Sequence, residues 1–224
     1  NEKLTGRAGA EIFYANEEDV FGTGDYLLAG LPADVTYDTR DDKFNPSKGI
    51  FASALIEPAY DALNSNAMVF VKATASSYIA LDDAKRFILA GRVSAGSIFA
   101  PSVQDVPASR RLIAGGGGSI RGYAYRNVGP RKNGEITGGR SLLELSGEVR
   151  IKATETIGIV GFVDAGNAYD DSTPDFSESF KIGVGAGVRY FTPIGPLRVD
   201  AAIPLDPDKD DPDFALYVGL SQAF

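Results

Sequence analysis

The 224-residue chain contains no cysteine and no histidine. Without cysteine it has no disulfide, no thiolate nucleophile and no zinc–thiolate site. Without histidine it lacks the commonest general base and metal ligand. No remaining side chain forms an obvious pair of nucleophile and base. The sequence therefore predicts a protein that is not an enzyme and that needs no metal or other cofactor.

Positive charge and long apolar runs are also scarce. The chain has 22 Lys and Arg against 30 Asp and Glu, a formal net charge of −8, which argues against nucleic-acid binding through a basic surface. No run approaches the roughly 20 apolar residues of a membrane-spanning helix. A closed β-barrel can still cross a bilayer, because its strands need only about 9–11 residues each. The start at Asn1, without a signal peptide and inside an expected strand, predicts a mature or truncated piece of a longer protein.

Alternation of apolar with small or charged residues dominates the chain. In 213–224, for example, Phe214, Leu216, Val218, Leu220 and Phe224 share one face. A period of two predicts β-strands with one apolar face, and no amphipathic helix of convincing length competes with them. About ten strands are expected: 3–15, 27–40, 48–60, 66–80, 86–99, 138–152, 156–167, 179–191, 196–205 and 213–224.

The connections between these strands differ in length. Those at 41–47, 81–85, 153–155 and 192–195 are short. Most of the others, at 16–26, 100–137, 168–178 and 206–212, are longer, although 61–65 is short. Short periplasmic turns and long outer loops are typical of bacterial outer-membrane barrels, so the parity places Phe224 on the periplasmic side. The alternative is a soluble all-β protein that ends on a hydrophobic strand.

One segment is specific enough to indicate a family. Residues 111–130 read RLIAGGGGSIRGYAYRNVGP, and they resemble the sixth extracellular loop of the outer-membrane-protein assembly superfamily, which includes BamA, TamA and the two-partner secretion transporters. Within the superfamily, the amino-acid sequence of this segment most resembles the TamA-like branch. In this family the loop folds back into the barrel lumen. The resemblance implies that its motif comprises Ile120, Arg121, Gly122 and Tyr123.

The resemblance also implies a receptor for Arg121 on the inner wall. Residues 161–167 (GFVDAGN) are similar to the family's Phe-x-Asp-x-Gly strand and give Phe162, Asp164 and Gly166, and the preceding strand gives Glu148. Alternation independently turns Phe162, Asp164 and Glu148 to the inner face. An inward arginine needs such partners, because burying it unpaired costs several kcal/mol. The glycines at 115–118 would let the loop turn, and those at 183, 185 and 187 would leave room for it.

By the same resemblance, the fold is an antiparallel transmembrane β-barrel, and 1–224 is the C-terminal part of it, the last ten or so of sixteen strands. The first strands and the periplasmic POTRA domains are absent. The last strand would form half of a weak seam, with Tyr217, Gly219, Leu220 and Phe224. A C-terminal aromatic resembles the sorting signal of such barrels.

The implied function is assembly and insertion of outer-membrane proteins, including autotransporters, in the bacterial outer membrane. The implied partners are nascent outer-membrane proteins, outer-membrane lipid and lipopolysaccharide, and a TamB-like inner-membrane protein. The alternatives are a two-partner secretion transporter, a BamA-type insertase and a passive barrel or porin.

Other charged motifs receive plainer interpretations. Asp206, Asp208 and Asp210 imitate the start of a calcium loop, but Asp211 and Tyr217 stand where its Gly and Glu belong, so a solvated acidic loop is expected. The remaining loop cations are expected to meet water or lipopolysaccharide phosphates; they are Arg110, Arg111, Arg126, Arg131 and Lys132.

Overall fold

The computed structural model describes residues 3–224, which form antiparallel β-structure with two short 3-10 helices. Before the long loop lie β1 (Leu4–Ala8), β2 (Glu11–Asp19), β3 (Gly22–Gly30), β4 (Ala33–Asp38), β5 (Gly49–Asp61), β6 (Asn66–Ala80) and β7 (Phe87–Phe99). The loop, residues 100–140, carries η1 (Val103–Asp105), η2 (Ala108–Arg110), β8 (Arg131–Lys132) and β9 (Glu135–Ile136). After it come β10 (Ser141–Lys152), β11 (Ile157–Tyr169), β12 (Lys181–Thr192), β13 (Gly195–Pro204) and β14 (Ala215–Leu220). Within residues 3–224, no helix has the length and apolar character needed to cross a membrane.

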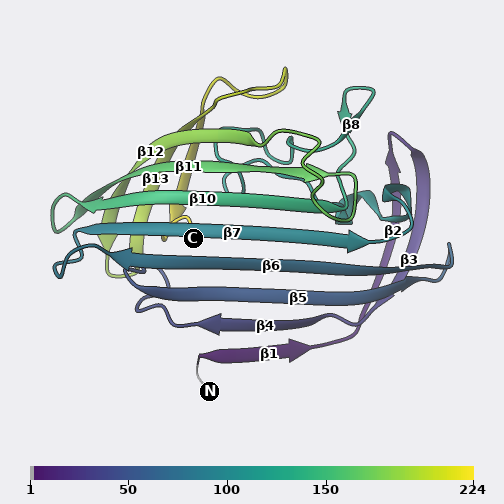
Figure 1. Cartoon of the computed structure of the whole chain (residues 1–224), viewed down its shortest axis with the longest axis horizontal. Coiled ribbons are helices and arrows are strands. Elements are labelled where there is room, and N and C mark those ends of the chain that lie inside the picture. The colour runs from purple at the N-terminus through teal and green to yellow at the C-terminus, as the bar shows by residue number, and fades with distance from the viewer. Residues whose placement is uncertain (1–2) are drawn as a thin grey trace.

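Twelve of these strands form one sheet in the order β1-β4-β5-β6-β7-β10-β11-β12-β13-β14, with β2 and β3 joined to it through β5 (Figure 1). Every strand pair is antiparallel, which confirms the all-β antiparallel prediction. The expected strands from 48–60 to 196–205 agree with β5–β7 and β10–β13 to within a few residues. Within residues 3–224, β1 and β14 each pair on one side only.

The first two expected strands differ from the structure. Residues 3–15 are divided between β1 and β2, and residues 27–40 between β3 and β4. The breaks lie at 9–10 and 31–32, where Pro32 has no N–H to donate to a ladder and where the Gly9 N–H donates to the Pro32 carbonyl at 2.9 Å. The sheet bends there, and β2 and β3 run on as a separate hairpin.

The prediction of a long outer loop at 16–26 is therefore wrong. β2 and β3 pair in register from Glu11 and Gly30 to Asp19 and Gly22, which leaves only residues 20–21 as the turn. Two acidic residues of this segment, which the sequence suggested to be loop, bind the loop 100–140 from the strand: Glu17 accepts from the Ser109 N–H and Asp19 from Arg111.

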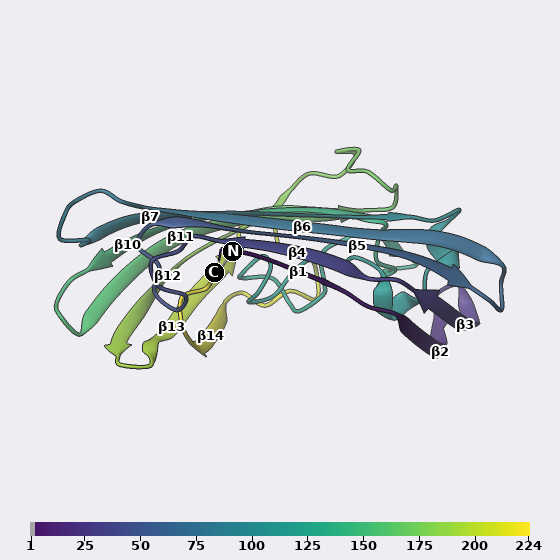
Figure 2. The same cartoon turned by 90° about the horizontal axis from the view of Figure 1, so that it is seen from below.

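The sheet is curved, with an outer convex and an inner concave face. In Figure 2 the β2–β3 hairpin and the strands β12–β14 curl toward the same side, and the loop 100–140 lies between them. Buried apolar clusters fill the space between the loop and the sheet. One of them joins loop residues Ala114, Ile120, Tyr123 and Val128 to Leu142 on β10 and Ala168 on β11.

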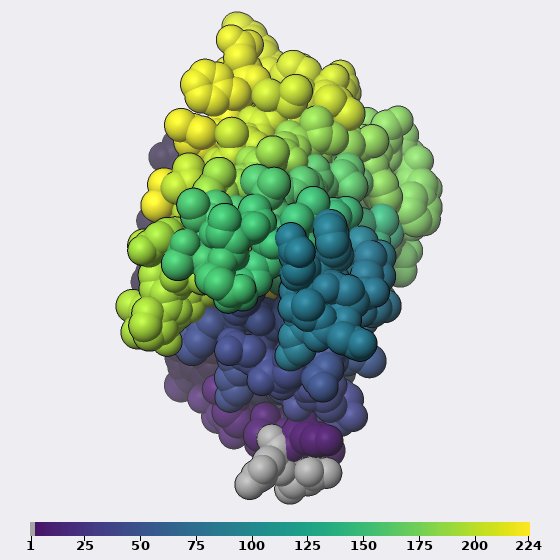
Figure 3. All heavy atoms as spheres, turned by 90° about the vertical axis from the view of Figure 1, so that its left-hand side faces the viewer, coloured from purple at the N-terminus to yellow at the C-terminus, as the bar shows by residue number. Residues whose placement is uncertain are grey.

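The two faces of the sheet differ in chemistry. Large apolar side chains such as Ile50, Ile79 and Val163 are exposed on the convex face, whereas Asp164 and Asp200 are buried on the concave face. A water-soluble β-protein buries its apolar side chains and exposes its charged ones, so this arrangement is the reverse. It is the pattern of strands that face lipid on the outside and polar groups on the inside. The short turns 39–48, 81–86, 153–156 and 193–194 gather at one end of the sheet, the turn end, which Figure 3 views directly.

The C-terminal residues also depart from prediction. The last strand ends at Leu220, and Ser221 has φ +78°, a left-handed conformation that turns residues 221–224 inward. Phe224 therefore does not share the outer face with Leu220. Its ring centre lies 6.3 Å from that of Tyr78, and the guanidinium groups of Arg92 and Arg150 lie 5.2 and 5.4 Å from it.

Candidate functional site

The loop 100–140 returns onto the concave face because its own backbone folds tightly. Leu112 forms a bridge with Gly139, and Ala114 forms one with Val128. Gly115 and Gly116 have φ of +104° and +99°, a region that side-chain-bearing residues rarely adopt. These turns bring the tip of the loop, residues 119–123, against the inner wall formed by β10–β13.

Arg121 is the centre of the resulting site. Its Nε and Nη2 donate to the two carboxylate oxygens of Asp164 at 2.7 and 3.0 Å, and its backbone N–H donates to the same group at 3.1 Å. Its Nη1 donates to Glu148 at 2.8 Å and to Asp200 at 3.4 Å. The guanidinium carbon lies 3.5 Å from the centre of the Phe162 ring. We call Arg121, Glu148, Phe162, Asp164 and Asp200 the Arg121 cluster.

The charges of this cluster are balanced by two further arginines. Arg150 Nε donates to Glu148 at 2.8 Å, and Arg189 Nη1 donates to Asp200 at 2.5 Å. Three guanidinium groups thus face three carboxylates, and all six side chains are at most 4% exposed. Arg198, whose side chain is 17% exposed, adds a longer contact to Asp200 at 3.9 Å. This pairing of opposite charges offsets part of the cost of removing them from water, whereas a broken pair would not.

Arg121 stays charged in this setting. Burial by itself would lower the pKa of its guanidinium, but the hydrogen bonds and charges of Asp164 and Glu148 outweigh burial and raise the pKa above its ordinary value. Arg121 therefore keeps the positive charge on which its contacts depend.

The other residues of the loop motif fix the tip in place. Ile120 is fully buried. Gly122 has φ +104°, and a Cβ there would come within 2.8 Å of the Ile203 backbone. The Tyr123 hydroxyl donates to the carbonyl of Ile182 at 3.1 Å. On the wall, a Cβ at Gly183 would overlap the Arg121 carbonyl oxygen, so the loop can lie this close only where β12 has glycine.

The structure brings the expected wall residues Glu148, Phe162 and Asp164 onto Arg121. Gly166 lies elsewhere: a Cβ on it would meet Leu143 and Glu144 of β10, so it permits close strand pairing. Asp200 is the partner that sequence reasoning missed. Its signal is an acidic residue on the inner face of β13, opposite Gly187, which leaves room for the Asp200 side chain.

The expected seam strand meets the same site. The Tyr217 hydroxyl accepts from the Gly122 N–H at 3.0 Å, and Gly219 lies against the Arg198 side chain. Leu220 is exposed on the convex face. Phe224, as described above, lies beyond β14 and points inward, so it is not part of that strand.

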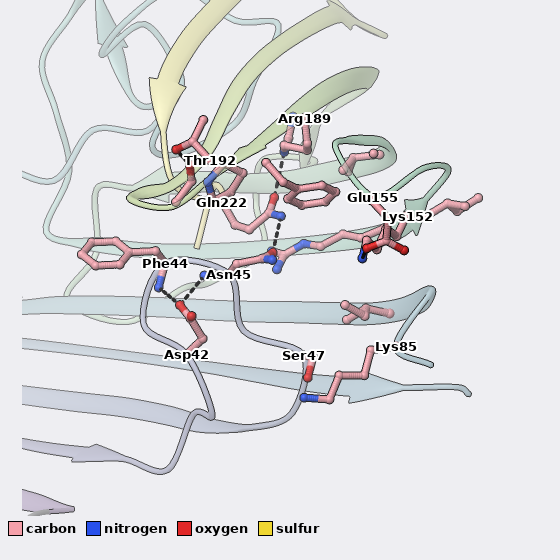
Figure 4. A pocket seen from close by; sticks show the side chains of 18 of the residues that line it. Asp42, Phe44, Asn45, Ser47, Lys85, Lys152, Glu155, Arg189, Thr192 and Gln222 are labelled. Carbon is pink, nitrogen blue, oxygen red and sulfur yellow. Dashed lines mark hydrogen bonds and ion pairs between the residues drawn. The ribbon is translucent and has the colours of Figure 1, made fainter. Parts of the chain in front are cut away.

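A cavity of about 570 Å³ opens at the turn end of the concave face (Figure 4). Gln222 crosses it, accepting from Arg189 at 2.7 Å and donating to Asn45 at 2.9 Å. Asp41 lies on the rim of the cavity. Burial alone would raise the pKa of its carboxyl group, but hydrogen bonds from Ser47 and Lys85 outweigh burial and hold the pKa below its ordinary value. The C-terminal residues and the turn 39–48 thus close this end of the inner face together.

Two of the loop cations expected to be solvated are not. Arg110 and Arg111 are paired with acids on β5 and β2, with side chains 18% and 1% exposed. In contrast, Lys132 is exposed, and Arg131, with its side chain 26% exposed, lies 3.8 Å from Asp208. In the acidic loop, Asp206 and Asp208 accept from Lys181 at 3.0 and 3.1 Å.

Comparison with known proteins agrees with this geometry. The Omp85 superfamily domain matches residues 2–224. The outer membrane protein assembly factor BamA of Nitratidesulfovibrio vulgaris is 30% identical over 180 residues, which cover 78% of this chain and 23% of that protein. A SAM50-like protein of Schizosaccharomyces pombe is 23% identical over 212 residues, covering 88% of this chain and 45% of the other.

A solved structure has a similar fold. The crystal structure of BamA from Haemophilus ducreyi lacking POTRA domains 1–3 matches 90% of this chain and 43% of its own length, with a TM-score of 0.71 and 22% identity. The chain thus spans less than half the length of these relatives. Omp85 and BamA homologues are bacterial outer-membrane β-barrel proteins, in agreement with the expected location. With a family match over nearly all its residues, the chain belongs to the Omp85 superfamily.

Proposed function

We propose that this chain is the C-terminal part of the β-barrel of an outer-membrane protein assembly factor. It would help nascent outer-membrane proteins, autotransporters included, to insert and fold, and it would do so without bond chemistry. The relatives it matches include proteins named outer membrane protein assembly factor BamA. Bacterial outer-membrane lipid and lipopolysaccharide would surround its convex face.

The observation that carries this proposal is the Arg121 cluster. A long loop that only narrowed a pore would need no fully buried arginine with three carboxylate partners. The cluster joins the loop to three strands, β10, β11 and β13, and Tyr217 extends the contact to β14. The loop therefore braces the part of the sheet that ends in a free strand edge.

The outer edge of β14 is where a client strand would pair, because in the full-length barrel it would form half of the seam. β14 hydrogen-bonds to β13 on one side only within residues 3–224. An unpaired strand edge offers a row of backbone donors and acceptors that can template an incoming strand. β14 is short, and the residues that follow it turn inward. Few backbone hydrogen bonds would therefore close the seam at this strand, which would lower the barrier to opening the seam.

Within the superfamily, we propose membership of the TamA-like branch. The support is the resemblance of residues 114–125 to that branch. A TamB-like inner-membrane protein would then be its partner. Co-purification of such a protein with the full-length chain would support the assignment, and a BamA-type set of partners in its place would contradict it.

The function is tested by Arg121→Ala in the full-length protein. Because the variant keeps every strand, we expect the barrel still to assemble while the amount of correctly folded client falls several-fold. Arg126→Ala is the matched control, because Arg126 lies on the same loop and makes no ion pair among residues 3–224. Normal client assembly in Arg121→Ala would refute the proposal.

A further inference from the structure

The loop 100–140 makes a second set of buried ion pairs, distant from the Arg121 cluster. They lie on its first limb, where Arg110 and Arg111 follow η2, and they reach the opposite part of the sheet. We call Arg110, Arg111, Asp19 and Glu57 the hairpin cluster.

Arg110 binds β5. Its Nη1 and Nη2 donate to the two oxygens of Glu57 at 3.1 and 2.6 Å, and its guanidinium carbon lies 4.1 Å from the centre of the Phe70 ring. Glu57 is 4% exposed. This is the same geometry as at Arg121, a bidentate carboxylate with an aromatic face beneath the fork.

Arg111 binds the β2–β3 hairpin. Its Nη1 donates to Asp19 at 2.5 Å and to the Thr137 carbonyl at 3.2 Å, and its Nε donates to the Val106 carbonyl at 2.9 Å. It therefore ties the hairpin, the first limb of the loop and the returning limb together. Tyr26 on β3 adds a bond from its hydroxyl to the Gln104 carbonyl at 3.0 Å.

These bonds cover a buried apolar cluster. Leu28 of β3 packs with Phe70 of β6, Ile98 of β7 and Val106 of the loop, and Val106 is fully buried. The loop thus rests on two supports: the hairpin cluster on β2, β3 and β5, and the Arg121 cluster on β10, β11 and β13. Only nine residues of chain lie between Arg111 and Arg121, so the first support limits where the second can dock.

Building on the function proposed above, we infer that Arg110 and Arg111 are positioning residues for Arg121. They seat the first limb of the loop against the β2–β3 hairpin, and the loop then spans the concave face as a strut between the two ends of the sheet. Asp19 and Glu57 are the receptors of this second contact. Loss of the hairpin cluster should therefore release the Arg121 cluster, although the two share no residue.

The chain has no cysteine, so single cysteines can report each support in the full-length protein. Val106→Cys lies under the hairpin cluster, and Ala168→Cys lies under the loop tip, both at fully buried positions. With a membrane-impermeant maleimide, we expect neither to react in the otherwise unchanged protein. Arg121→Ala should expose only Ala168→Cys.

Asp19→Asn and Arg111→Ala decide the inference, because each should expose both reporters and raise their labelling rates at least about tenfold. Asp19→Asn leaves the loop sequence intact, so it settles the matter if Arg111→Ala fails to fold. Tyr125→Cys, at an 81% exposed position, should react in every background, and Arg126→Ala should change nothing. If Asp19→Asn exposed Val106→Cys alone, the inference would be overturned. Protection of both reporters in the Asp19→Asn protein would also overturn it.

Client assembly separates the two proposals. If Asp19→Asn releases the loop and client assembly falls, both stand. If it releases the loop and clients still assemble normally, the positioning role stands and the proposed function fails.

Discussion

Arg121 makes contacts that lysine could not supply at the same position. A guanidinium binds both oxygens of Asp164 while its other nitrogen reaches Glu148 and Asp200, and its flat face lies on Phe162. An ammonium group is a compact charge and cannot bridge three acids in this way. Asp164 makes no other ion pair among residues 3–224, so removal of Arg121 leaves its carboxylate buried without a cationic partner.

Charge balance yields a double-mutant prediction. Arg121→Met leaves Asp164 buried without its partner and should lower the free energy of unfolding by about 3–5 kcal/mol. Adding Asp164→Asn removes the stranded charge, so the two losses should fall short of additivity by about 0.5–3 kcal/mol. Denaturant unfolding followed by far-ultraviolet circular dichroism measures both. Strictly additive losses would mean that the two groups do not interact.

Much of this cluster could be predicted from the sequence, and the reason is local. Phe162, Asp164 and Glu148 occupy inner positions of strands with clear alternation, and the loop motif identifies Arg121. Arg110 and Arg111 were misjudged because their partners, Glu57 and Asp19, are 53 and 92 residues away along the chain. Nothing in the local pattern separates a paired loop arginine from a solvated one.

At the level of elements, the wall matters as much as the loop. β12 presents Gly183, Gly185 and Gly187 inward, and each glycine gives space to a different neighbour: the Arg121 carbonyl, the Phe162 ring and the Asp200 carboxylate. Alternation predicted β10–β13 because these strands each have one uniformly apolar face. It failed at 16–26, where Glu17 and Asp19 bind the loop 100–140 and Asp25 accepts from Asn16 within the hairpin.

The wall glycines permit a sharp test with a matched control. Gly183→Ala places a methyl group where the Arg121 carbonyl lies, so we expect the loop tip to shift and Ala168→Cys to become reactive toward maleimide. Gly161→Ala adds the same methyl group on β11 where nothing lies within 4 Å, and it should leave Ala168→Cys protected. Equal reactivity of Ala168→Cys in the two variants would show that the loop does not pack closely against β12.

At the scale of the whole molecule, the curved sheet that residues 3–224 form is held by a loop that crosses its inner face. The hairpin cluster holds one end of that loop and the Arg121 cluster the other, with apolar cores between them. The sequence predicted the sheet and one of these supports. It did not predict the bend at Gly9 and Pro32 or the inward turn at Ser221, because both depend on contacts made across the folded molecule.

The central claim is that the Arg121 side chain is buried inside the barrel when the protein is in a lipid membrane. Side-chain hydrogen exchange measures that burial directly. With ¹⁵N-labelled arginine in the protein embedded in lipid nanodiscs, the Nε–H of Arg121, bonded to Asp164, should exchange with water at least about tenfold more slowly than that of Arg126. The Arg121→Lys variant identifies its signal. Equal exchange at the two arginines would place Arg121 in solvent and contradict the account.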